Sequence, residues 1–215
     1  MVRWLAIIGL LLLITACSLQ PSQDNDQAIL EQALAENNPA LCSEITREHW
    51  ITWCYSDIAA NTQDKQVCDY LEGSFKENCI KTIALSTQDI ELCQEIRGTG
   101  AGDACYNNFA REALNATICS DIESLRMKND CFVFLARENK DYNTCLLVEE
   151  DQGLKENCLF RATLIEETNE GCALIESRAL RDACYITYAA NFGSPDDCDD
   201  VSTGQQGACE QAVNQ

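Results

Sequence analysis

A regular series of cysteines carries the clearest chemistry in this sequence. The chain of 215 residues has 15 cysteines, and 14 of them lie between Cys42 and Cys209. Their spacing alternates between 14 residues and 11 to 13 residues. Zinc, haem and iron–sulfur sites usually need closely spaced cysteines or several histidines, but this chain has no C-x-x-C pair and one histidine. We therefore predict disulfides, with no metal site and no cofactor.

The single histidine, His49, lies in the stretch REHWITWC together with Trp50 and Trp53. Aromatic side chains concentrate binding energy at protein interfaces, so these three residues are candidates for an interaction site. The alternative, which we favour, is that the two tryptophans pack the turn of the first repeat against the preceding helix. Catalysis by a His49–Cys54 pair is disfavoured, because we expect Cys54 to form a disulfide.

Three pairs of adjacent acidic residues are the other candidates for chemistry: Glu149–Glu150, Asp196–Asp197 and Asp199–Asp200. They suggest either calcium ligands or acid–base carboxylates. None follows the EF-hand spacing, and carboxylates in turns or first helical turns also stabilise free backbone amides. The sequence has no nucleophile elbow, phosphate-binding loop or dinucleotide motif. We predict no catalytic residues and no enzymatic activity.

The N-terminus begins with one cation, Arg3, followed by an apolar run from Trp4 to Ile14. This run is short for a membrane span, which favours a cleaved signal peptide. The four residues ITAC, ending at Cys17, resemble the lipobox of bacterial lipoproteins. The resemblance implies that residues 1–16 are removed and that Cys17 carries acyl chains such as palmitate. An ordinary signal peptide near an unrelated cysteine is the alternative.

The resemblance to a lipobox predicts where the protein is located, and the composition predicts which kinds of partner it binds. Ser18, where an aspartate would retain a lipoprotein at the inner membrane, implies the outer membrane, on its periplasmic side or at the cell surface. Residues 17–24 are expected to form a polar tether. The whole chain carries a net charge of −20, and removal of Arg3 leaves 14 basic against 35 acidic side chains. Such an acidic protein is not expected to bind nucleic acid or anionic lipid surfaces.

The cysteine spacing defines a repeat of about 26 residues that occurs seven times. Four positions before the first cysteine of each repeat stands a residue that commonly begins a helix, and Pro39 and Pro195 follow two of these caps. The seven caps are Asn38, Asp64, Asp89, Asn115, Asp141, Thr168 and Ser194. An apolar residue three positions after each first cysteine completes one face of a short helix: Ile45, Leu71, Ile96, Ile122, Val148, Ile175 and Val201.

Each second cysteine begins a wider apolar stripe, which predicts a second helix of about ten to twelve residues. Its fourth following residue is usually large, and its fifth is alanine in five repeats. Seven of the ten glycines lie between the paired cysteines, so we expect the tight turn of each hairpin there. The repeat is therefore a helical hairpin with a short helix, a turn and a longer helix.

The N-terminal flank decides which cysteines pair. Residues 25–41 resemble the second helix of a preceding repeat whose cysteine is replaced by Ala28, followed by the start of repeat 1. Bonds between neighbouring hairpins would leave Cys42 and Cys209 without partners, whereas bonds within hairpins leave none. We predict Cys42–Cys54, Cys68–Cys79, Cys93–Cys105, Cys119–Cys131, Cys145–Cys158, Cys172–Cys184 and Cys198–Cys209, numbered hairpins 1 to 7.

The predicted fold is an all-α solenoid of seven disulfide-stapled hairpins over residues 38–215, one domain preceded by a cap helix. The design is similar to that of Sel1-like repeat proteins, which also close helical hairpins with disulfides but have a longer repeat. Stacked hairpins present extended surfaces to other proteins. We predict a membrane-anchored scaffold or envelope-complex accessory protein that binds another envelope or secreted protein. The alternative is a small-ligand-binding or enzymatic lipoprotein that uses a groove of the solenoid.

Overall fold

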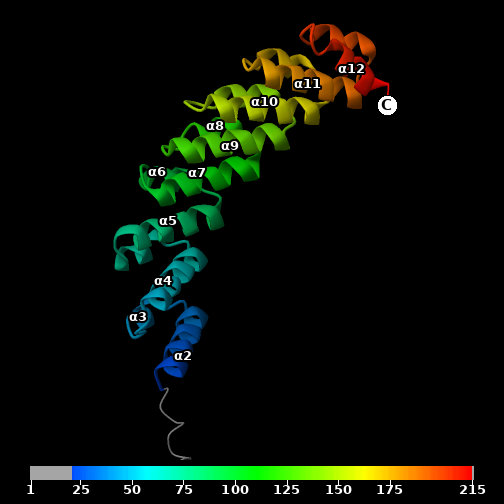
Figure 1. Cartoon of the computed structure of the whole chain (residues 1–215). Helices are drawn as coiled ribbons and strands as arrows, with labels where there is room; N and C mark the ends of the chain where they lie inside the picture. The colour runs from blue at the N-terminus through cyan, green and yellow to red at the C-terminus, as the bar shows by residue number, and fades with distance from the viewer. Residues whose placement is uncertain (1–20, 215) are drawn as a thin grey trace, which may run out of the picture. The chain divides into compact units, whose positions relative to one another are not determined.

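The computed structural model describes residues 21–214, and within this range the chain is helical without β-strands. The signal peptide, the lipobox and Cys17 lie outside the described residues, so those expectations stay predictions. The chain divides into two compact units, the first ending at Thr87 and the second beginning at Gln88. Each unit is built from helical hairpins (Figure 1).

In the first unit, the cap helix is followed by two hairpins. The cap helix α2 packs on α4, and α4 packs on α5. The elements are α2 (Pro21–Glu36), α3 (Pro39–Cys42), α4 (Glu48–Thr62), η1 (Lys65–Tyr70) and α5 (Gly73–Thr87).

The second unit contains five hairpins, whose long helices α7, α9, α10, α11 and α12 pack one on the next (Figure 1). Its elements are α6 (Glu91–Glu95), α7 (Gly100–Ala113), α8 (Ala116–Cys119), α9 (Leu125–Glu138), η2 (Tyr142–Leu147), α10 (Gln152–Glu166), η3 (Glu170–Leu174), α11 (Arg178–Asn191), η4 (Pro195–Asp200) and α12 (Gln206–Val213).

All seven predicted disulfides are present, and each joins the two helices of one hairpin. The Cα atoms of the paired cysteines lie 5.6 to 5.8 Å apart. Every bonded cysteine is buried, with at most 4% of its surface exposed. The bonds therefore lie inside the core of each hairpin, and the predicted class of fold is confirmed.

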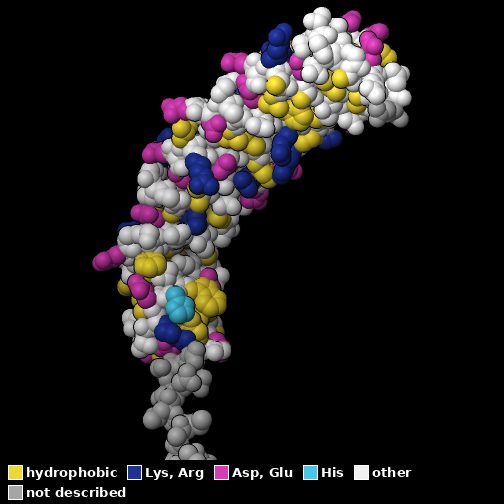
Figure 2. Space-filling view, viewed as in Figure 1, with side chains coloured by type: hydrophobic (Ala, Val, Ile, Leu, Met, Phe, Trp, Pro, Cys, Tyr) yellow, Lys and Arg dark blue, Asp and Glu magenta, His cyan; other side chains and the backbone are white. Residues whose placement is uncertain are grey.

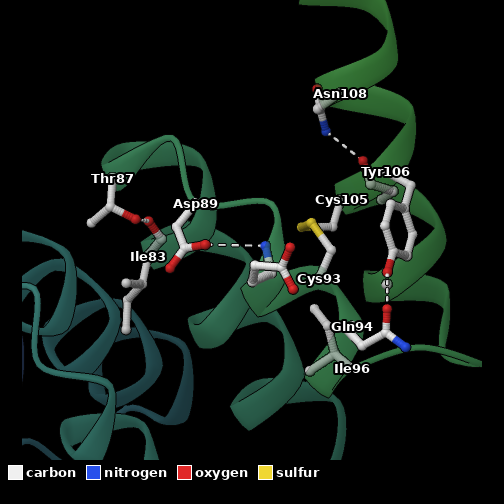
Figure 3. The surroundings of a disulfide bond; sticks show 12 residues. Ile83, Thr87, Asp89, Cys93, Gln94, Ile96, Cys105, Tyr106 and Asn108 are labelled. Carbon is white, nitrogen blue, oxygen red and sulfur yellow. Dashed lines mark hydrogen bonds between the residues drawn. A yellow bond between two sulfur atoms is a disulfide. The ribbon is translucent and has the colours of Figure 1, made fainter. Parts of the chain in front are cut away.

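Five of the seven predicted caps directly precede their short helices, whereas Ile90 and Asn169 stand between the predicted caps Asp89 and Thr168 and the helices α6 and η3. The side chains of Asn38, Asp64, Asn115 and Asp141 each accept a hydrogen bond from the backbone amide two residues later. Figure 3 shows the equivalent bond in hairpin 3, where the amide of Glu91 donates to Asp89 at 3.1 Å beside the Cys93–Cys105 disulfide. These bonds satisfy an amide that a helix start leaves free.

The helix lengths differ from those expected. The first helix of each hairpin is a single turn of four to six residues, and four of the seven are 3-10 helices. The apolar residues three positions after the first cysteines lie at or just beyond its end, yet all seven are at most 7% exposed. The second helix has 14 or 15 residues, except α12 with eight, because it begins well before its cysteine.

The N-terminal boundary is also earlier than expected. Helix α2 begins at Pro21, so residues 21–24 of the predicted tether are helical instead. Proline is well suited to a first helical turn, where its missing amide hydrogen costs no hydrogen bond. Leu30 and Ala33 are the buried apolar residues by which α2 joins the core. The half-repeat in the sequence is thus a complete cap helix of 16 residues.

The tightest turns do not depend on glycine as expected. Of the glycines between paired cysteines, Gly73 and Gly98 have a positive φ. Glu150, between Cys145 and Cys158, also has a positive φ. After α2, α4, α5, α7, α9 and α10, a non-glycine residue adopts a left-handed conformation directly before the next cap. These residues are Asn37, Gln63, Gln88, Leu114, Lys140 and Glu167.

Buried polar side chains link the cap helix to hairpin 1 and hairpins 3 to 6 to the turn of the next hairpin. We call Asp26, Asp103, Asn129, Glu156 and Asp182 the bridging residues; all five are at most 7% exposed. Four of them stand two positions before a second cysteine, and Asp26 stands two positions before Ala28, which replaces one. Each contacts backbone amides 20 or 21 residues later in the chain. The sequence analysis did not predict this interaction.

The geometry of the bridges is alike in each case. Asp103 accepts hydrogen bonds from the amides of Glu123 at 2.8 Å and Ser124 at 3.0 Å. Asn129 both accepts from the amide and donates to the carbonyl of Glu149. Backbone amides of the following turn thereby give each buried carboxylate or amide the hydrogen bonds that its burial requires.

Three bridging carboxyls have lowered pKa values. Burial raises the pKa of Asp26. The hydrogen bonds from Thr46 and Arg47 together lower this pKa by more than burial raises it, so the net shift is downward. The side chain of Gln152 and the amide of Ser177 lower the pKa of Glu156 despite burial. The hydroxyl of Ser202 is the main cause of the lowered pKa of Asp182.

We predict that Gly102→Ala destabilises the second unit whereas Gly100→Ala does not. A Cβ atom on Gly102 would lie 2.2 Å from the carbonyl oxygen of Ile96, but one on Gly100 would meet nothing within 4 Å. Both glycines lie in the first turn of α7. Denaturant unfolding should show a loss of about 1–3 kcal/mol for Gly102→Ala and no loss for Gly100→Ala. Equal effects of the two substitutions would contradict this packing.

We predict that Asp182→Asn destabilises the protein at pH 7 and that this difference disappears in acid. Because the folded pKa of Asp182 is lowered, its contribution is complete above the unfolded pKa of about 4 and is lost as the pH falls through the folded value. Arg178 and Arg181 add favourable charge to the same carboxylate. The asparagine in the Asp182→Asn variant can still form a neutral bridge of the kind that Asn129 makes, so the substitution removes the charge and not the bridge.

The measurement is denaturant unfolding of wild type and variant between pH 7 and pH 2.5. Asp199→Asn, which changes an exposed acid nearby, serves as the control. A stability difference for Asp182→Asn that stays constant over the whole pH range would show that the carboxylate charge is unimportant.

Candidate functional site

The three predicted interaction residues lie on one face of α4. His49 and Trp50 are in its first turn, and Trp53 follows one turn later. Residues three or four positions apart share a helix face, so the three side chains form one surface, which we call the aromatic face. The rings of His49 and Trp50 meet edge to face with centroids 6.1 Å apart.

Trp50 and Trp53 have different environments. Trp50 is half-buried under the guanidinium of Arg47, 3.6 Å from the ring centre, and Arg47 forms an ion pair with Asp26 of the cap helix at 3.0 Å. Trp53 is 51% exposed. The interpretation that both tryptophans pack against the preceding helix therefore does not describe Trp53.

The orientation of Trp53 is nevertheless fixed. Its side chain donates a hydrogen bond to Asp57, one turn later on α4, and burial raises the pKa of Asp57 more than this bond lowers it. Trp53 also directly precedes Cys54, whose disulfide holds α4 against α3. A large aromatic side chain is thus exposed to solvent on a helix whose position is covalently constrained.

A groove in the second unit is a separate candidate site. It has a volume of about 860 Å³ and lies along facing stripes of α9 and α10, with Arg111 contributed by α7. Its apolar wall consists of half-buried side chains: Val133, Phe134, Leu154, Leu164 and Ile165. Sequence reasoning did not identify it.

Arginines surround the apolar wall of this groove. The guanidinium carbons of Arg111 and Arg137 lie 4.2 Å and 5.5 Å from the ring centre of Phe134. Arg161 of α10 also lines the groove, and Asp130 is the one acidic residue in the lining. Figure 2 shows Lys and Arg side chains interspersed with apolar ones over α7, α9 and α10.

The groove coincides with an exception in the repeat pattern. At the fourth position after the second cysteine, hairpin 5 has Ala162, whereas the other six hairpins carry a larger apolar side chain. Ala162 lines the groove, so its small side chain leaves volume that leucine or phenylalanine fills elsewhere. The next residue, Thr163, replaces the usual alanine and is fully buried against Gly171. Of these two departures from the repeat, only Ala162 lines the groove, and it is the one signal in the sequence that points to the site.

In two of the three acidic pairs, one residue makes hydrogen bonds that stabilise the fold. Asp197 accepts hydrogen bonds from the amide and hydroxyl of Ser194, which begins η4. The amide and carbonyl of Glu149 pair with Asn129. Within residues 21–214, no three His, Cys, Asp or Glu side chains are grouped so that they could hold a metal ion.

Comparison with known proteins gives no match: no protein family, no curated protein and no solved structure is significantly similar to this chain. In the part of the chain that the structure describes, no helix has both the length and the apolar character needed to cross a membrane.

Proposed function

We propose that the protein is a lipid-anchored scaffold of the bacterial cell envelope that binds another envelope or secreted protein. Support for the anchor comes from the N-terminal sequence, where Cys17 ends a lipobox-like stretch. Seven disulfides favour an oxidising compartment outside the cytoplasm. Ser18 after the lipidated cysteine favours the outer membrane, on its periplasmic side or at the surface.

The observation that carries this proposal is the half-exposed Trp53 on a disulfide-bound helix. An exposed tryptophan whose orientation is already fixed loses little conformational entropy on binding and buries a large apolar area. Tryptophan, with arginine and tyrosine, is also enriched among residues that dominate binding energy. The aromatic face therefore has the composition and the rigidity of a protein-binding surface.

A second function, the binding of a small ligand, is supported by the groove. It gathers one arginine from each of the three consecutive hairpins 3, 4 and 5, so that their side chains converge on one volume. Such convergence is typical of small-molecule sites, whereas a flat repeat surface lacks it.

We predict that the aromatic face contacts the protein partner. A photoreactive amino acid in place of Trp53 should crosslink, in intact cells, to one or a few envelope proteins. The same photoreactive residue in place of Phe192, which is 47% exposed in the second unit, is the matched control. Crosslinked proteins at position 53 that are absent at position 192 support the proposal; identical or no products at position 53 contradict it.

The energetic part of this prediction uses Trp53→Ala. Loss of a central aromatic contact costs about 2 kcal/mol or more at such surfaces, which corresponds to a decrease in affinity of roughly 30-fold. Since about half of the Trp53 side chain is exposed in the free protein, the melting temperature should change little. Unchanged affinity for the crosslinked partner would remove Trp53 from the interface.

A further inference from the structure

The charge of the groove is opposite to that of the protein. The whole chain has 35 acidic and 15 basic residues, yet the groove lining has three arginines and one aspartate. A local excess of positive charge on a strongly acidic protein is unlike its general surface. It selects anions and disfavours cations, because the groove's own charge would repel a cation at short range.

The arginines are positioned beside apolar surface. The Arg111 guanidinium lies over the Phe134 ring, and its Nε donates to Asn107 of the same helix at 3.2 Å. A neutral amide partner leaves the positive charge uncompensated. Arg161 lies on the opposite helix, α10, next to Ala162. The groove therefore combines cationic heads with an apolar wall.

The nature of the anion is indicated by Arg137. Its Nε and Nη2 both donate to one carboxylate oxygen of Glu138, at 2.9 Å and 2.7 Å. This pair is solvent-exposed, with 60% and 40% of the two side chains accessible, and such pairs contribute little stability. The carboxylate of a ligand can therefore replace that of Glu138 as the hydrogen-bond acceptor of Arg137, which then still binds a carboxylate.

Size and apolar character define the rest of the ligand. A volume of about 860 Å³ is within the range of small-molecule sites, roughly 300–1,000 Å³. The side chains of Leu154, Leu164 and Ile165 are apolar, so this part of the groove suits the hydrocarbon body of a ligand. The site fits a molecule with one anionic end and one apolar end.

We propose that the groove between α9 and α10 binds an amphiphilic carboxylate, with its head on Arg111, Arg137 and Arg161 and its alkyl or aryl body against Phe134 and the α10 side chains. This inference rests on the second function, small-ligand binding, and is independent of the aromatic face. The small Ala162 provides part of the space for the apolar body.

The first test measures ligand class with the oxidised full-length protein in zwitterionic lipid nanodiscs. Calorimetric titrations use dodecanoate, dodecyl phosphate, dodecyltrimethylammonium, dodecanol and an acidic peptide without apolar residues, each corrected with empty nanodiscs. Dodecanoate should bind saturably and more tightly than every other probe. Preferred binding of the phosphate, the cation, the alcohol or the peptide overturns the proposal, as does a lack of binding by dodecanoate.

The second test locates the binding. Arg111→Gln, Arg137→Gln and Arg161→Gln should each weaken dodecanoate binding by about tenfold, the effect of losing one charge-assisted hydrogen bond. Arg126→Gln, which removes the same charge from α9 outside the groove, is the matched control and should leave binding unchanged. Equal effects of all four variants would mean that the ligand responds to net charge alone and would refute a site in the groove.

The third test fills the groove. Ala162→Leu restores the larger apolar residue of the other hairpins and should reduce dodecanoate binding at least tenfold, with the melting temperature measured to confirm folding. If this variant does not fold, the arginine variants alone decide. Trp53→Ala must leave dodecanoate binding unchanged. Conversely, failure of dodecanoate to bind leaves the crosslinking result at Trp53 intact, so the two proposals fail separately.

Discussion

One covalent bond in each hairpin holds a short helix against a longer one, which has 14 or 15 residues in hairpins 1 to 6 and eight in hairpin 7. A helix of four to six residues is not stable alone, because its nucleation is not repaid by enough backbone hydrogen bonds. Closing a loop of 11 to 13 residues restricts the unfolded chain and contributes about 3 kcal/mol by loop-entropy arguments. The six cysteines of hairpins 5 to 7 lie in the same buried cluster as Ile175 and Val201. The disulfide therefore both restricts the unfolded chain and forms part of the buried core.

Neighbouring hairpins are joined by apolar packing and by polar bridges, whereas the disulfides lie within hairpins. A bridging residue on one long helix satisfies amides in the following turn, and Asp26 does so from the cap helix, although Ala28 stands where a cysteine would be. Thr52 occupies the equivalent position in hairpin 1 and bonds the carbonyl of Glu48 in its own helix instead. The bridge is thus a feature of most repeats that depends on an acidic or amide side chain of sufficient length.

The repeat itself could be predicted because its signals are local and occur seven times. A cap, a cysteine four residues later and an apolar residue three further on constrain the same few backbone bonds in every hairpin. The short first helix was overestimated because burial of residues such as Leu71 and Val148 continues into extended backbone after the helix has ended. The bridges were missed because their partners are 20 residues apart and one of them is a backbone amide.

Both candidate sites depend on departures from the repeat. The pattern places Trp53 on a helix face, but only the packing of α4 shows that this ring stays in solvent. The groove depends on the small side chain of Ala162 and on Arg111, which reaches Phe134 from another hairpin. The alanine is visible in the sequence as an exception to the repeat, but the contact of Arg111 with Phe134 can be recognised only in the structure. A repeat that is fixed in position by its own disulfides can carry such exceptions, since the framework around them does not depend on the altered residues.

The connectivity of the disulfides is the most direct test of this account. Proteolysis of the unreduced protein followed by mass spectrometry should identify seven linked peptide pairs, each joining the two cysteines of one hairpin from Cys42–Cys54 to Cys198–Cys209. Linked peptides that connect adjacent hairpins, or unmodified thiols at several of these positions, would contradict it.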